Sequence, residues 1–203
     1  LLSGGRLDFG VGKGYRFSEF DGFRIPMDEA TERFEEAMAV IRAAWTTEGR
    51  FSHRGKRWLF EDIIVEPATI QQPHPPFWMA AGRPESLRAA AHGGYNLLLD
   101  QFQTVDVILE RLAIYREALG EIDRAWNPMG AVYITETASE RQTAVAARIR
   151  QLAFMNTHGQ SADGKHRSSM VSDDDLTKAT EDGVLIGTPT EIIDRLRKLA
   201  EGG

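Results

Sequence analysis

Apolar residues follow two patterns along the chain, one with the period of a strand and one with the period of a helix. Leu7, Phe9 and Val11 are spaced two residues apart, which is typical of a strand with one buried face. From about 28 to 46, apolar residues recur at intervals of three and four, which predicts an amphipathic helix. The same order recurs further on, with short apolar strands predicted at 75–82, 95–99 and 131–135.

Residues that favour helix ends indicate where the later helices begin and stop. Pro84 fits the first position of a helix reaching His92, because its missing N–H group is not needed there. Thr104 and Gly120 are expected to start and stop the next helix. Two further starts show a capping-box spacing, Ser139 with Gln142 before a helix through Phe154, and Thr188 with Glu191 before the last helix.

Two segments depart from this alternation. Residues 50–66 read as an irregular hairpin that turns at Arg54-Gly55. Residues 156–183 are polar and contain Gly159 and Gly164, so we expect a mobile insertion loop there.

Alternation of apolar strands with helices predicts an α/β fold in which helices cover a parallel sheet. The pattern supplies four strand–helix units and one final helix. A closed barrel of eight such units takes roughly 250 residues, so the chain corresponds to about half a barrel. A small open doubly wound sheet explains the same periodicity equally well.

Composition narrows the function classes. A net charge of −6 argues against a nucleic-acid surface, which would be basic, and no apolar run is long enough for a membrane span. The chain has no cysteine, and its five histidines lack metal-ligand spacing, so we expect neither a thiolate nucleophile nor a metal site. These features together predict a cytoplasmic protein that acts on a small molecule.

Two loops at the predicted carboxyl ends of strands are suited to an anion. The first, GVGKGY, places Lys13 between Gly12 and Gly14, where backbone and a positive charge can approach a phosphate closely. A tight turn with a solvated lysine is the structural alternative. The second, AAGRPES, leads from a strand into a helix start, whose N–H groups and dipole favour negative charge. Gly82, Arg83 and Ser86 are its candidate binding residues, and ordinary helix capping is the alternative.

Four stretches of the chain resemble one known family. GRLDFGVGKGY, MDEATERFEEAMAVIRAAW, PPFWMAAGRPESLRAAAHGGYNLLL and IGTPTEIIDRL together are similar to the bacterial luciferase-like flavin-dependent monooxygenases, in matching order and at matching separations. The resemblance implies a TIM (β/α)8 barrel that uses reduced FMN and O2 to oxidise a small organic substrate. It also implies that Lys13, Gly82, Arg83 and Ser86 contact the flavin phosphate.

The resemblance further bears on domain organisation and partners. It implies that GRLDFGVG is the fourth barrel strand, so that residues 1–203 form a single α/β barrel domain, truncated at both ends, with about strands 4–7 present. The catalytic residues are then expected before Leu1 and none is assigned here. A flavin reductase and a second copy of the chain, forming a homodimer, are the implied protein partners. Gly12 stands where luciferase has a cysteine, so light emission is not expected.

Three other functions remain open from the sequence. One is a flavin-binding relative without turnover, and a second is hydride transfer with a deazaflavin, a cofactor that some relatives use. The third is a phosphosugar-binding barrel, because the same two loops suit a sugar phosphate.

Overall fold

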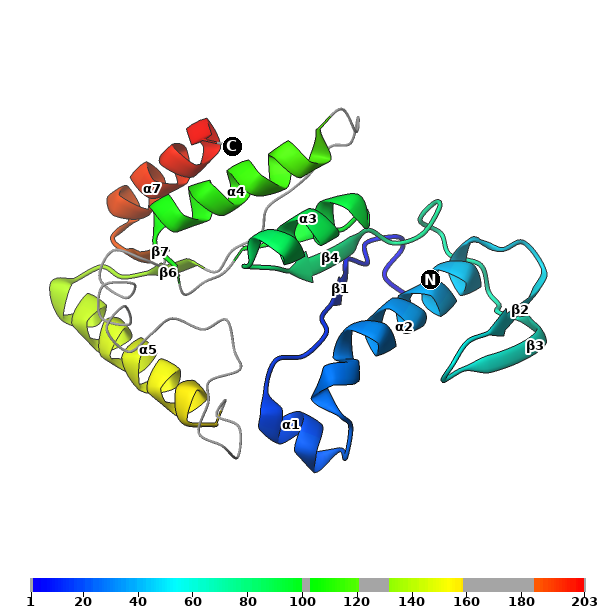
Figure 1. Cartoon of the computed structure of the whole chain (residues 1–203). Coiled ribbons are helices and arrows are strands. Elements are labelled where there is room, and N and C mark those ends of the chain that lie inside the picture. The colour runs from blue at the N-terminus through cyan, green and yellow to red at the C-terminus, as the bar shows by residue number, and fades with distance from the viewer. Residues whose placement is uncertain (1, 100–102, 121–131, 159–184, 203) are drawn as a thin grey trace. The chain divides into compact units, whose positions relative to one another are not determined.

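The computed structural model describes residues 2–99, 103–120, 132–158 and 185–202, and it confirms the predicted alternation of strands and helices (Figure 1). The first elements are β1 (Phe9–Val11), α1 (Phe17–Gly22), the 3-10 turn η1 (Met27–Glu29), α2 (Ala30–Thr46), β2 (Arg50–Arg54) and β3 (Leu59–Ile64). They are followed by β4 (Phe77–Ala80), α3 (Pro84–His92), β5 (Asn96–Leu98) and α4 (Val105–Leu119). The last are β6 (Val132–Ile134), α5 (Ala138–His158), β7 (Leu185–Gly187) and α7 (Pro189–Gly202).

The strands form three sheets, and those that the structure describes do not close into a barrel. One sheet has the order β1-β4-β5, β2 and β3 form an antiparallel hairpin, and β6 pairs in parallel with β7. The chain divides into two compact units, Leu1–Gly14 with Glu19–Trp78, and Tyr15–Ser18 with Met79–Gly203. The boundary falls within β4, so this strand contributes residues to both units.

An aromatic cluster forms the centre of the first unit. Phe77 of β4 is 1% exposed, and its ring stacks on Trp45 of α2 at a centroid distance of 5.7 Å. Phe9 of β1 meets Trp45 edge to face at 4.9 Å, and His74 stacks on Phe77 at 4.1 Å. Aromatic pairs in these arrangements add to the gain from burial alone. The cluster therefore joins β1, α2 and the start of β4.

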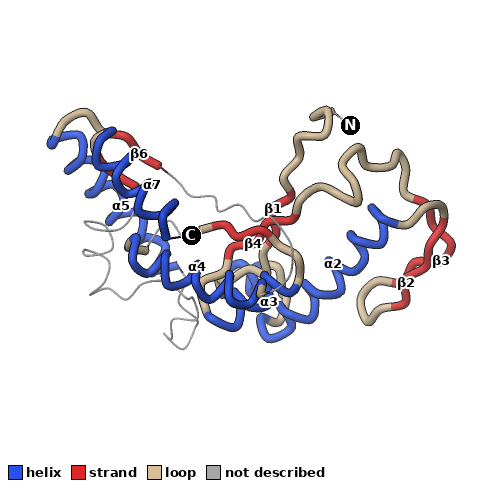
Figure 2. The backbone as a smooth tube through the Cα atoms, turned by 90° about the horizontal axis from the view of Figure 1, so that it is seen from above, coloured by secondary structure: helices blue, strands red, loops and turns tan. Residues whose placement is uncertain are grey.

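Helix packing forms the centre of the second unit. Leu87 and Ala90 of α3 are fully buried, as are Leu112 and Tyr115 of α4, and the two helices pack against each other. The Tyr115 hydroxyl donates a hydrogen bond to the backbone carbonyl of Tyr95, directly before β5. These contacts hold α3, α4 and the β5 end of the sheet in one body, whose helices are seen from above in Figure 2.

Most predicted helix boundaries are confirmed, and one predicted cap is wrong. The Thr104 hydroxyl accepts a hydrogen bond from the Val107 N–H group, and α4 stops at Gly120 with φ 51°. In α5, the capping box is made by Thr137 and Glu140, not by Ser139 and Gln142. Both pairs have the same spacing. The earlier pair forms the cap because α5 already begins at Ala138, shortly after β6 ends.

Three elements differ from the sequence prediction. α1 carries too few residues to show an apolar stripe, and β7 is a three-residue strand that the pattern did not separate from the helix after it. α5 continues to His158 rather than Phe154. The rest of the predicted insertion, 159–183, lies outside the described residues.

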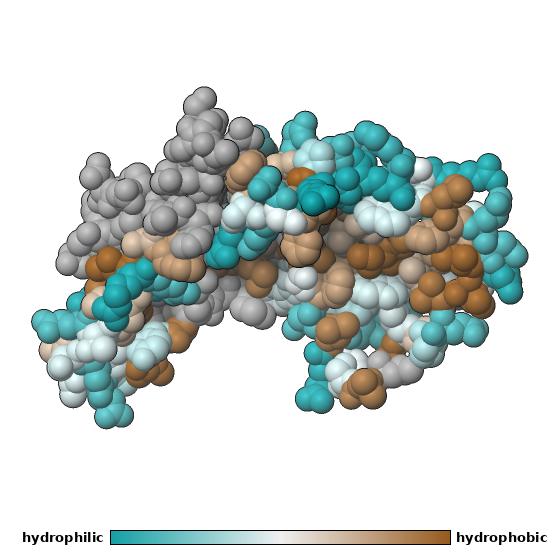
Figure 3. All heavy atoms as spheres, turned by 90° about the horizontal axis from the view of Figure 1, so that it is seen from below, coloured by the Kyte–Doolittle hydropathy of each residue, from teal (hydrophilic) through white to brown (hydrophobic). Residues whose placement is uncertain are grey.

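Large apolar side chains remain exposed in both units. Phe23 and Leu59 are 79% and 70% exposed, and all three residues of β6 are exposed because a sheet of two short strands covers neither face fully. Figure 3 shows such apolar areas on the face that it draws. None of the helices in the described part of the chain is long and apolar enough to cross a membrane.

A charged cluster ties the hairpin to α2. Arg57, whose side chain is 11% exposed, donates to Glu29 at 2.7 Å and lies 3.3 Å from Glu32. The Glu36 carboxylate accepts the N–H groups of Trp58 and Arg57, both at 2.9 Å. These two hydrogen bonds, with a smaller contribution from His53, hold the pKa of Glu36 below its ordinary value.

We predict that Glu36→Gln loosens the hairpin turn. The backbone amides of Arg57 and Trp58 should then exchange with solvent about tenfold faster at pH 7, because a neutral acceptor binds them less strongly than a carboxylate. A carboxylate with a lowered pKa stabilises the fold above the ordinary Glu pKa of about 4.3, and that contribution is lost as the pH falls through the pKa of the folded state.

The difference between wild type and Glu36→Gln should therefore vanish in acid, as measured by amide exchange protection at several pH values. Glu35→Gln is the matched control, since Glu35 is exposed and lies next to Glu36 on α2. Equal protection of these amides in wild type and Glu36→Gln at pH 7 would contradict the assignment.

Candidate functional site

The loop after β1 holds Lys13 between two glycines, of which only Gly14 has a backbone conformation that favours glycine. Gly14 has φ +79°, and a Cβ atom there would lie 2.9 Å from the ring of Phe20. Gly12 needs no such conformation, and nothing lies within 4 Å of the position that its Cβ would take. Lys13 itself is half-buried. The turn is thus fixed at Gly14, while Gly12 leaves open space beside Lys13.

The loop after β4 leads directly into the start of α3. Arg83 is the N-cap residue in extended conformation, with φ −89° and ψ 146°, and Pro84 follows as the first helical residue. Arg83 is exposed and Ser86, in the first turn, is half-buried. Glu85 in the same turn is exposed and carries the opposite charge to the one that an anion site needs.

The start of α3 lacks the side-chain cap that the other long helices of this unit have. Thr104, Thr137 and Thr188 each accept a hydrogen bond from the backbone of α4, α5 and α7. At α3 the N-cap residue Arg83 makes no side-chain cap hydrogen bond. The N–H groups at the start of a helix need an acceptor from a side chain, water or ligand, so this start is suited to an external anion.

The structure brings three of the four predicted site residues together. Gly82, Arg83 and Ser86 lie on one loop and the helix start after it, within the second unit. Lys13 belongs to the first unit. Contact of Lys13 with the same anion as these three residues is therefore a proposal.

Sequence reasoning missed one residue at the second loop. The guanidinium group of Arg111, from α4, lies against Gly82, at 3.2 to 3.4 Å from the position that a Gly82 Cβ would take. No local spacing signals this contact, because Arg111 comes from the next strand–helix unit along the chain.

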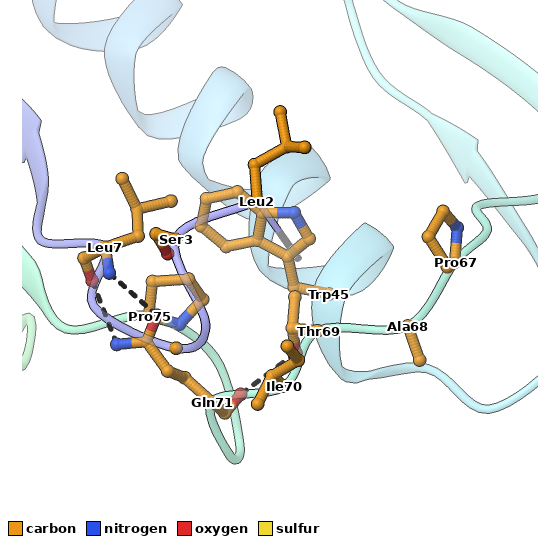
Figure 4. Close-up of a pocket in the computed structure, with 11 residues that line it drawn as sticks. Leu2, Ser3, Leu7, Trp45, Pro67, Ala68, Thr69, Ile70, Gln71 and Pro75 are labelled. Atoms are coloured by element: carbon orange, nitrogen blue, oxygen red, sulfur yellow. Dashed lines mark hydrogen bonds between the residues drawn. The ribbon is translucent and has the colours of Figure 1, made fainter.

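A pocket of about 440 Å³ lies elsewhere in the first unit (Figure 4). Its walls are mainly apolar and include Trp45, Ile70 and Pro75. The side-chain amide of Gln71 accepts from the Leu7 N–H group and donates to the Leu7 carbonyl, so its polar groups are used within the chain. Apart from Trp45 of α2, the lining residues lie in the segments before β1 and β4, whereas ligands of parallel α/β folds collect at the carboxyl ends of strands. This pocket is therefore distinct from the two predicted loops.

The fold and the loops define an α/β protein with an anion-suited helix start soon after strand β4. The chain matches the family model of luciferase-like monooxygenases over residues 1–203. It belongs to this family, as the resemblance of its motifs implied.

Named relatives fit this assignment. The chain is 26% identical over 213 residues to the oxygenase component of the flavin-dependent trigonelline monooxygenase of Acinetobacter baylyi, covering 97% of this chain and 59% of that protein. It is also 26% identical to the FMNH2-dependent dimethylsulfone monooxygenase of Pseudomonas putida, covering 96% of this chain and 58% of that one.

Solved structures show the same fold. Monooxygenase RslO1 from Streptomyces bottropensis superposes with a TM-score of 0.77 and 27% identity, covering 99% of this chain and 60% of that chain. An F420-dependent secondary alcohol dehydrogenase has a TM-score of 0.68 at 12% identity, covering 97% of this chain and 61% of that one, and this likeness concerns the fold alone. In each comparison the chain spans about three fifths of the other protein's length.

We predict that Gly14→Ala destabilises the Lys13 loop whereas Gly12→Ala does not. An alanine at positive φ costs about 1–2 kcal/mol, and its Cβ would also displace the Phe20 ring. Denaturant unfolding should therefore show a loss of at least about 1 kcal/mol for Gly14→Ala and a change within about 0.5 kcal/mol for the matched Gly12→Ala. Equal losses for both variants would show that the turn is not fixed at Gly14.

Proposed function

We propose that this chain is the flavin-binding part of an FMN-dependent monooxygenase that oxidises a small organic substrate with O2 and reduced flavin. The observation that carries the proposal is the family match over the whole chain, which includes both anion-suited loops. Its relatives from Acinetobacter baylyi and Pseudomonas putida are named as flavin-dependent and FMNH2-dependent monooxygenases. The complete protein is proposed to be a (β/α)8 barrel.

The second loop provides the groups that a flavin phosphate needs. The uncapped start of α3 offers backbone N–H groups and the positive end of the helix dipole. Arg83 adds a positive charge, and the Ser86 hydroxyl can donate a hydrogen bond. Gly82 allows the backbone to approach the phosphate closely. The residues of this loop therefore fit FMN better than riboflavin, which lacks the phosphate.

Lys13 is proposed to supply the second positive charge from the loop after β1. The open space beside Gly12 leaves room for a ligand there. Reduced flavin, when bound, supplies the electrons that activate O2, while the protein binds the cofactor, orients the substrate and excludes water. Catalytic residues for the substrate are not assigned to this chain.

We propose a flavin reductase as a partner and a homodimer as the assembly. The relative from Acinetobacter baylyi is named as an oxygenase component, which supports a separate supply of reduced flavin. The substrates in the two relatives' names, trigonelline and dimethylsulfone, are small organic molecules. We therefore propose a small organic molecule as the substrate.

Hydride transfer with a deazaflavin is the second candidate, because the fold is shared with an F420-dependent dehydrogenase. Oxygen consumption separates the two reactions. With reduced FMN, a monooxygenase consumes O2 in proportion to the substrate oxidised, whereas a deazaflavin enzyme oxidises substrate without O2. FMN binding without turnover of either kind would favour a non-catalytic flavin-binding relative.

We predict that Lys13→Glu weakens FMN binding roughly ten- to hundredfold and leaves riboflavin binding within about threefold, because only FMN carries the phosphate. The measurement is a flavin fluorescence titration with both ligands. Lys56→Glu, which makes the same change of charge on the hairpin, should bind FMN as wild type does. An equal loss of affinity for FMN and riboflavin in Lys13→Glu would contradict the assignment of Lys13 to the phosphate.

A further inference from the structure

The contact between Arg111 and Gly82 has a specific geometry. The position that a Gly82 Cβ would take lies 3.2 Å from Nη1, 3.3 Å from Cζ and 3.4 Å from Nη2 of Arg111. Near-equal distances to these three atoms mean that the guanidinium group turns its flat face toward Gly82. Its N–H groups lie in the plane of that face, so they point alongside the loop rather than at Gly82.

The glycine at position 82 leaves room for this contact. Distances of 3.2 to 3.4 Å are tighter than most side-chain contacts, so a Cβ would displace the guanidinium group by a few tenths of an ångström. Gly82 has no positive φ that would demand glycine for backbone reasons. The close approach of Arg111 is therefore what the glycine accommodates.

Arg111 reaches the loop from a rigid element. Its neighbours on α4, Ile108, Leu112 and Tyr115, are all buried, so the backbone that carries Arg111 is fixed by the core. Groups on packed helices hold a site more firmly than groups on loops. The guanidinium group thus packs behind the loop between β4 and α3 from a helix whose backbone is held by the core.

We infer that Arg111 is a positioning residue of the phosphate loop, which holds the Gly82 backbone in place through its flat face and adds a positive charge behind the start of α3. This inference rests on the proposed function, since it assigns Arg111 to the same flavin phosphate site. A lysine would keep the charge but has no flat face to pack on Gly82. Arg111 thereby links α4 to the loop between β4 and α3.

The test compares FMN with riboflavin in the full chain by fluorescence titration. Arg111→Met, which keeps an unbranched apolar stem but removes the guanidinium group, should weaken FMN binding about tenfold and change riboflavin binding less than threefold. Arg111→Lys should fall between wild type and Arg111→Met. Arg116→Met is the matched control, because Arg116 lies on the same helix but donates to the Gly202 carbonyl. If Arg111 had only a general structural role, Arg111→Met would weaken binding of FMN and of riboflavin equally. That result would overturn the inference.

A double-mutant cycle tests the contact itself. Gly82→Ala should weaken FMN binding in the wild-type background, but much less in the Arg111→Met background, where the Cβ no longer meets the guanidinium group. Additive effects of the two substitutions would overturn the inference.

Different results would overturn the proposed phosphate site and the role of Arg111. A wild-type chain that binds riboflavin as tightly as FMN would overturn the proposed phosphate site and the role of Arg111 with it. A wild-type preference for FMN that persists unchanged in Arg111→Met would overturn the role of Arg111 alone.

Discussion

Burial of β4 is the constraint on which the rest of the structure depends. Phe77, Trp78 and Met79 are all buried, and the stacking of Phe77 on Trp45 fixes the start of the strand against α2. The Trp78 indole N–H donates to Asp8, directly before β1, at 2.9 Å. The strand ends one residue after its buried part, at the exposed Ala80, and the Gly82 loop leads from there into α3.

Features encoded by neighbouring residues could be predicted from the sequence. Thr104 and Thr188 start helices because each hydroxyl meets an N–H group three residues later, a contact that depends on local geometry alone. The same locality misled the prediction for α5, where Thr137 with Glu140 and Ser139 with Gln142 both satisfy the capping-box spacing. The pattern cannot choose between overlapping pairs, because the choice depends on where the chain leaves β6.

Features made by distant residues could not be predicted in this way. Arg57 pairs with the carboxylates of Glu29 and Glu32, and Arg111 packs on Gly82, only because segments that are far apart in the sequence meet in space. The glycine at 82 was recognised from its loop, but the reason for it lies on α4. The two loops could be proposed as anion sites because strand ends, glycines and charge are visible in the sequence, whereas the groups that pack against those loops are not.

The start of α3 lacks a side-chain cap that would stabilise the helix. A threonine or serine at position 83 would cap the helix and gain about 1 kcal/mol, as the threonines at the other helix starts do. The chain has Arg83 there instead, which makes no side-chain cap hydrogen bond. A side-chain cap would compete with an anion for the same N–H groups. A phosphate bound at this start would itself cap α3, so cofactor binding and the stability of this helix would rise together.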